Sequence, residues 1–207
     1  IFSKALAENA KICYNNLSIY FLLKGLYSMN TKELRSAIKE RRIDSTLTEL
    51  YGEANLAKQT DRYLRAIDEF EKLYGTMENV EIFSVSGRSE LSGNHTDHNH
   101  GCVVAASIDL DIIAIAAKTE GSVIRVKSEG FSEDVVDFAT YNEPVVSKFG
   151  SSASIIAGMC RGFANNGHKI GGFTAYTTSS VLKGSGLSSS AAFEDMIGNI
   201  LNHIYND

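Results

Sequence analysis

The stretch "LKGSGLSSSAAFED", Leu182 to Asp195, joins a glycine- and serine-rich segment directly to a strongly periodic one. Upstream of it, "GGFTAYTTSSV" has the β-branched and aromatic content of a strand. Downstream, apolar residues recur at helical spacing between residues 189 and 205. This order predicts a strand, a loop and a helix in immediate succession.

The loop in this succession is suited to bind an anion. Gly184 and Gly186 allow a ligand to approach the backbone closely, and Ser188, Ser189 and Ser190 supply amides and hydroxyls at the start of the helix. Free amides and the helix dipole together favour a phosphate group. The Walker A sequence is absent because no Gly-Lys-Ser/Thr follows. A plain turn with a serine cap is the alternative interpretation.

A second polar stretch, "GRSELSGNHTDHNHG", covers residues 87–101 and contains three histidines. Its glycines and asparagines predict a turn between two strands, in which alternate side chains diverge. Arg88, His95 and Asp97 could hydrogen-bond a polyhydroxylated ligand, and a solvated turn is the alternative. A metal-binding or hydrolytic module is disfavoured, because the spacing matches neither a zinc finger nor H-E-x-x-H. That metal site would use His95, Asp97, His98 and His100.

The remaining periodicity predicts an α+β or mixed α/β chain in one domain. Helices are expected at residues 31–43, 61–74 and 145–166, with Asp61 as a cap and with the charges of 61–74 in solvent. Strand-like patterns begin at Val80. They are "VEIFSVS", "GCVVAASIDL", "DIIAIAAKT" and "GSVIRVKSEG", the second and third being separated at Asp111.

Composition limits the classes of protein. The 207 residues are 43% hydrophobic and 22% charged, which is typical of a globular chain with its own core. The net charge of −5 argues against a nucleic-acid partner. Three widely spaced cysteines suit free thiols in a reducing compartment. No run approaches the roughly 20 apolar residues of a membrane span, so we expect a soluble, cytoplasmic protein without a membrane partner.

The beginning of the chain has an unusual pattern. Met29 opens "MNTKELRSAIKE", which resembles a native N-terminus, and the codons of Lys24 and Gly25 could contain a ribosome-binding sequence. We therefore expect a leader at 1–28, a helical N-terminal segment at 29–79 and a main domain at 80–207. An ordinary N-terminal helix is the alternative for the first segment.

Taken together, the two polar stretches resemble the GHMP kinases and, within them, the galactokinase family. That family carries "GR-x-x-L-x-G-E-H-T-D-Y-N-x-G" on a turn between strands and, later in the chain, "G-x-G-L-S-S-S-A" at the start of a helix. The resemblance covers residues 80–207. It implies an α+β fold, the GHMP-kinase N-terminal domain with a mixed sheet packed against helices, truncated before the C-terminal domain.

The resemblance also assigns roles to residues. Arg88 falls on the arginine that stabilises charge at the transferring phosphoryl group. The sugar-binding loop comprises Asn94, His95, Thr96 and Asp97. The ATP phosphate loop comprises Gly184, Ser185, Gly186, Leu187, Ser188, Ser189 and Ser190.

Two further roles concern the cofactors, ATP and Mg²⁺. Ser190 falls on a Mg²⁺ ligand, and Ser128 is expected near the base or ribose of the nucleotide. The catalytic aspartate of the family and the carboxylate that completes its Mg²⁺ site are expected beyond Asp207, so this chain alone is expected to be inactive.

The sequence departs from the family pattern at several positions. Asn94 replaces a glutamate in the sugar loop and removes a charge there, and His98 replaces a tyrosine. Ser86 and Leu182 each stand where the family has a proline. The substitution at Asn94 bears on which sugar is bound more than on the chemistry.

The implied function is phosphorylation of a sugar by ATP at the anomeric hydroxyl, with galactose converted to galactose 1-phosphate as the first expectation. One alternative is another GHMP kinase that acts on an amino sugar or other small alcohol, which Asn94 keeps open. The other is a non-catalytic sugar sensor on the same fold.

Overall fold

The computed structural model describes residues 29–93, 99–140, 150–181 and 186–206. Its centre is a five-stranded mixed sheet with the strand order β1-β2-β5-β3-β4. Neighbouring strands are antiparallel except β3 and β5, which are parallel. The strands are β1 (Val80–Ser92), β2 (Val104–Lys118), β3 (Val123–Ser128), β4 (Glu133–Asp137) and β5 (Phe173–Ser179).

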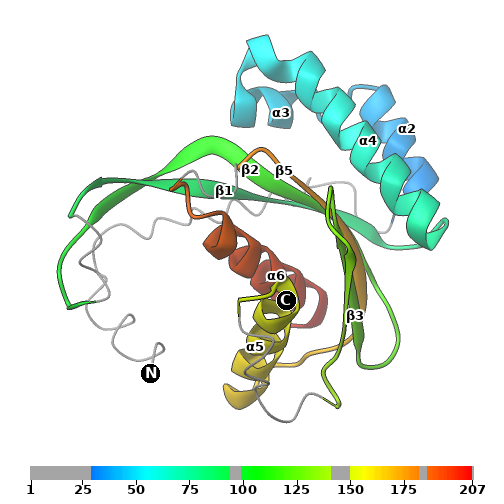
Figure 1. Ribbon diagram of the computed structural model, residues 1–207. Coiled ribbons are helices and arrows are strands. Elements are labelled where there is room, and N and C mark those ends of the chain that lie inside the picture. The colour runs from blue at the N-terminus through cyan, green and yellow to red at the C-terminus, as the bar shows by residue number, and fades with distance from the viewer. Residues whose placement is uncertain (1–28, 94–98, 141–149, 182–185, 207) are drawn as a thin grey trace.

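Helices cover both faces of the sheet (Figure 1). On one face lie α2 (Thr31–Lys39), α3 (Asp44–Tyr51) and α4 (Leu56–Tyr74), with a short 3₁₀ turn at Glu53–Asn55. On the other face lie α5 (Ser152–Asn165) and α6 (Ser189–Tyr205). This helix–sheet–helix arrangement confirms the α+β fold class with a mixed sheet.

The sheet divides the apolar core into two clusters. In β2, Ile112 and Ala114 belong to the cluster under α5 and α6, whereas Ile113 and Ile115 belong to the cluster under α2, α3 and α4. The alternation follows from the period of two in a strand. Since both faces are covered, residues 112–117 are all buried and the strand reads as a continuous apolar run.

Several predicted boundaries differ from the observed ones. The helix at 189–205 is confirmed as α6, and α5 lies within the predicted 145–166, of which 145–149 fall outside the described residues. The helix predicted at 61–74 begins earlier, at Leu56, so Asp61 is not its cap. The 3₁₀ turn before Leu56 leads the chain into the helix without a side-chain cap from Asn55.

The first predicted helix, 31–43, ends early. It stops at Lys39 because Arg41 adopts a left-handed conformation (φ 63°), a common way to end a helix. The next helix, α3, and the edge strand β4 were not predicted, and both are short and rich in polar residues.

The predicted division of "GCVVAASIDL" from "DIIAIAAKT" at Asp111 is wrong. Residues 104–118 form one strand of 15 residues that runs through Asp111. A buried charge ordinarily ends a strand, but here Arg62 forms an ion pair with it. No helix within the described ranges is long and apolar enough to cross a membrane.

Candidate active site

The glycine- and serine-rich stretch leads into the start of α6. Ser188, the N-cap residue, has a left-handed backbone (φ 58°, ψ 43°), and Gly186 also has a positive φ of 77°. A left-handed conformation is costly for a residue other than glycine, and such residues concentrate at binding sites. The Ser188 side chain caps none of the described amides of α6.

The first turn of any helix has amides without an acceptor inside the helix. In α6 these amides belong to residues 189–191, and the 17-residue helix behind them adds its dipole. The arrangement suits a phosphate group.

The structure brings the two sequence motifs together, although about a hundred residues separate them. A β-bulge interrupts β1 between Ser86 and Arg88, and bulges often lie next to active sites. At the bulge, the Arg88 backbone amide donates a hydrogen bond of 3.2 Å to the Leu187 carbonyl. The first motif therefore lies against the residue just before the N-cap of α6.

Gly87 permits this close approach. A Cβ atom at this position would lie 3.1 Å from the Leu187 carbonyl oxygen and 3.1 Å from Cγ2 of Val181. It would also lie 3.2 Å from Cδ1 of Ile108. Such distances are tighter than ordinary packing, which explains why glycine precedes Arg88.

One acidic side chain of α6, Asp195, lies near enough to Arg88 to be affected by its charge. Desolvation, followed by repulsion from Glu194, raises the pKa of the Asp195 carboxyl group, while the positive charge of Arg88 acts in the opposite direction. Arg88 and Asp195 are thus close enough to interact electrostatically. Sequence reasoning missed Asp195, although its spacing of seven residues from Ser188 places both on one face of the helix.

The other predicted site residues have varied positions. Leu187, Ser188 and Ser189 are half-buried, and Gly186 and Ser190 are exposed at the beginning of α6. Ser128 ends β3, pairs with Thr177 of β5, and its hydroxyl accepts a hydrogen bond of 2.9 Å from the Thr177 hydroxyl. Outside the described residues lie Asn94, His95, Thr96, Asp97, Gly184 and Ser185.

The metal alternative involves residues of the same connection. His98, like His95 and Asp97, lies outside the described residues, and His100 is exposed with a positive φ of 63°. Within the described ranges, no three histidine, cysteine, aspartate or glutamate residues gather into a metal-binding group.

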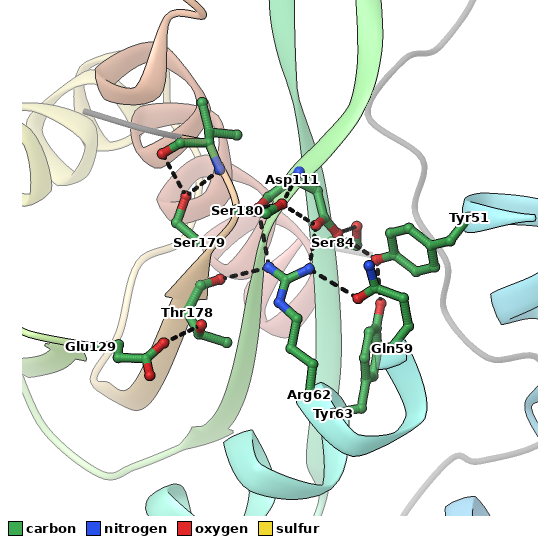
Figure 2. Close-up of polar contacts among 11 residues, drawn as sticks. Tyr51, Gln59, Arg62, Tyr63, Ser84, Asp111, Glu129, Thr178, Ser179 and Ser180 are labelled. Carbon is green, nitrogen blue, oxygen red and sulfur yellow. Dashed lines mark hydrogen bonds and ion pairs between the residues drawn. The ribbon is translucent and has the colours of Figure 1, made fainter. Parts of the chain in front are cut away.

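A buried polar cluster lies beneath α4 (Figure 2). The Nη1 atom of Arg62 is 2.6 Å from Oδ1 of Asp111, and the exposed fractions of the two side chains are 11% and 5%. The Nη2 atom donates to the backbone carbonyls of Asp111 (3.1 Å) and Thr178 (3.0 Å). The expectation that the charges of 61–74 lie in solvent is therefore wrong for Arg62.

The Asp111 carboxylate has further partners. Its Oδ2 atom accepts from the hydroxyls of Tyr51 (2.5 Å) and Ser84 (2.6 Å). Burial, followed by the negative charge of Asp111, raises the pKa of Tyr63, and burial dominates the raised pKa of Tyr51 as well. Both phenols therefore stay protonated and act as donors.

Ser180 connects this cluster to the end of β5. Its backbone amide donates to the Asp111 carbonyl at 2.8 Å, and its hydroxyl accepts from the Asp111 amide at 2.9 Å. Sequence reasoning missed the cluster because no motif links residues that are this far apart in the chain.

Several known proteins are similar to this chain in sequence and in fold. Residues 68–118 match a family model described as the galactokinase galactose-binding signature. The chain is 37% identical over 120 residues to a galactokinase of Pyrococcus furiosus, covering 58% of this chain and 32% of that protein. It is 32% identical over 140 residues to a galactokinase of Clostridium beijerinckii, covering 67% and 36%. The chain thus spans about a third of the length of the curated relatives it matches.

Among solved structures, the fold resembles Lactococcus lactis galactokinase complexed with galactose. The TM-score is 0.60 at 28% identity, over 68% of this chain and 37% of that one. The fold resembles that of the GHMP kinases, the class to which galactokinase belongs. Within that class, the similarity is to the galactokinases, which confirms the resemblance drawn from the two motifs.

Proposed function

We propose that the protein phosphorylates galactose with ATP at the anomeric hydroxyl. The observation that carries the proposal is the hydrogen bond from the Arg88 amide to the Leu187 carbonyl, through which residues of the two motifs are in contact. The names of the relatives and the galactose of the solved galactokinase support the choice of sugar.

At the nucleotide end, the loop of residues 184–190 and the first amides of α6 hold the phosphates of Mg·ATP. Ser190, exposed in the first turn of the helix, supplies a hydroxyl ligand to the magnesium ion of this substrate. Ser128, at the end of β3, lies toward the nucleoside. The strained Ser188 backbone and the outward amides support this assignment.

At the sugar end, Asn94, His95, Thr96 and Asp97 bind the hydroxyls. They belong to the connection between β1 and β2, which starts just beyond the register pair Ser92–Val104. The signature match at 68–118 spans this connection and supports the assignment. A carboxylate there accepts hydrogen bonds from hydroxyls, while an imidazole can donate or accept.

Between the two ends, the Arg88 guanidinium stabilises the charge on the transferring phosphoryl group. Phosphoryl transfer depends mainly on positioning and on electrostatic stabilisation, because little covalent chemistry is left to the protein. An arginine held by its own backbone at a bulge is well placed for that role.

The proposal extends to the organisation of the protein. Residues 80–207 form the main domain, which carries both motifs. Residues 29–79 form a helical segment on the face of the sheet away from α5 and α6. The enzyme acts in the cytoplasm. A leader at 1–28 remains our prediction for the residues before Met29.

Calorimetry tests the proposal directly. Titration of the chain with Mg·ATP and with galactose should show that both bind and that glucose binds more weakly than galactose. Absence of nucleotide binding refutes the kinase assignment, and indifference between the two sugars refutes galactose as substrate.

Asn94 favours one second candidate, an amino-sugar kinase, because it replaces a carboxylate with an amide. Galactosamine in the same titration separates the two substrates: tighter binding of the amino sugar than of galactose supports the second. Galactose-dependent ADP release by the complete gene product distinguishes a kinase from a non-catalytic sensor.

A further inference from the structure

The buried cluster under α4 fixes the backbone at the end of β5, where the chain leaves the sheet for the glycine- and serine-rich stretch. Arg62 donates to the Thr178 carbonyl, and Asp111 exchanges backbone and side-chain hydrogen bonds with Ser180. Figure 2 shows Thr178 and Ser180 beside the Arg62–Asp111 pair. The ion pair therefore holds two residues near the end of β5, Thr178 and Ser180, by hydrogen bonds.

The contact continues from Ser180 to the motif at residues 87–101, which contains Arg88. Val181, the next residue, is 4% exposed, and its Cγ2 atom would lie 3.1 Å from a Cβ atom on Gly87. Gly87 in turn lies against the Leu187 carbonyl, at the other end of the loop. Gly87 thus lies against both Val181, which follows Ser180, and Leu187, which precedes the N-cap of α6.

We propose that Arg62 and Asp111 are positioning residues for Leu187 and the N-terminus of α6, an inference that rests on the nucleotide-binding role proposed above. They do not touch the ligand. They act through Ser180 and the next residue, Val181, which packs against Gly87 at the β1 bulge, where Leu187 also makes contact.

The fact that Arg62 and Asp111 are charged supports a positioning role for them. A buried ion pair is weak evidence for stability, because desolvation of the two charges offsets much of their attraction. What the pair adds is geometry. The planar guanidinium of Arg62 contacts a carboxylate and two backbone carbonyls at once, from two adjacent strands. An apolar pair of similar volume has no directional contact with these carbonyls.

The experiment separates positioning from stability by measuring both on the same variants. The dissociation constant of Mg·ATP is determined by calorimetry on the 207-residue chain, at a temperature at which every variant is folded. The variants are Ser180→Ala, which removes the hydroxyl link, and Asp111→Asn, which removes the negative charge and with it the ion pair. The matched control is Tyr63→Phe, which removes a hydroxyl bonded to Tyr51 in the same cluster.

We expect Asp111→Asn and Ser180→Ala each to weaken Mg·ATP binding about tenfold, since small misplacements of binding groups have effects of this size or larger. Tyr63→Phe should lower the melting temperature and leave the dissociation constant unchanged. If Asp111→Asn does not fold, Ser180→Ala decides the matter.

Two results would overturn the inference in different ways. Folded Ser180→Ala and Asp111→Asn chains that bind Mg·ATP as tightly as the wild type refute the positioning role alone. A wild-type chain without affinity for Mg·ATP refutes the nucleotide site itself, and the positioning role with it.

Discussion

On the α5–α6 side, Arg88 is an exposed cation at a bulge, whereas on the α2–α4 side Arg62 is a cation buried against Asp111. The first arginine belongs to a recognisable motif, and its backbone is held while its guanidinium stays accessible. The second belongs to an ordinary-looking helix, and its guanidinium is fully engaged. The arginine proposed to act on the phosphoryl group is thus exposed, whereas the arginine that holds the sheet together is buried.

The largest expected effect contrasts these two arginines. Arg62→Met should destabilise the chain by about 3–5 kcal/mol, because it leaves the Asp111 carboxylate buried without its cation. Arg88→Met should change the free energy of unfolding by no more than about 0.5 kcal/mol, as is usual for an exposed residue. Urea denaturation measures both, and equal losses would contradict the division of roles.

A smaller effect is expected from a neutral partner of Asp111. Tyr51→Phe removes a hydrogen bond to a buried carboxylate and should cost about 1.5–3 kcal/mol of unfolding free energy. Ser190→Ala, at an exposed position of α6, should remain within about 0.5 kcal/mol of the wild type. A tyrosine variant as stable as the wild type would show that Asp111 does not depend on this donor.

The contact between the two motifs can be tested with a single methyl group. Gly87→Ala places a Cβ atom 3.1 Å from the Leu187 carbonyl, and such overpacking costs about 1–3 kcal/mol. We expect weaker Mg·ATP binding as well, since the loop must shift. Gly158→Ala is the control: its Cβ atom meets no described atom within 4 Å, and alanine in a helix should stabilise α5 by about 0.5–1 kcal/mol. If the two variants behave alike, the close approach at Gly87 has no consequence.

The smallest effect is expected at Asp195 and depends on pH. Because the pKa of its carboxyl group is raised in the folded chain, folding favours the neutral form, and ionisation destabilises the fold as pH rises above the ordinary value of 3.8. Asp195→Asn should therefore raise the melting temperature at neutral pH, and the gain should disappear below that value. A gain that is independent of pH would argue against an ionised Asp195 beside Glu194.

The predictable part of the fold lies where local patterns are strong. The helix at 189–205 and the antiparallel strands β1 and β2 carry clear apolar patterns. Both motifs stand out by composition. The short helix α3 and the edge strand β4 were missed because short polar elements carry little periodicity of their own. Asp111 misled the strand assignment, since its compensation by Arg62 cannot be seen from either residue alone.

By itself, the sequence determined the α+β class, the helix that became α6 and the resemblance of the two motifs to a kinase family, and it predicted the loop and the turn that carry them. These depend on local periodicity and on local backbone requirements such as the glycines. Tertiary structure alone decided three further features: that the Arg88 amide meets the Leu187 carbonyl, that Asp195 lies near Arg88, and that Arg62 is buried against Asp111. Each is a contact between segments distant in the chain. The free energy of such a contact depends on burial and on partners that only the folded sheet brings together.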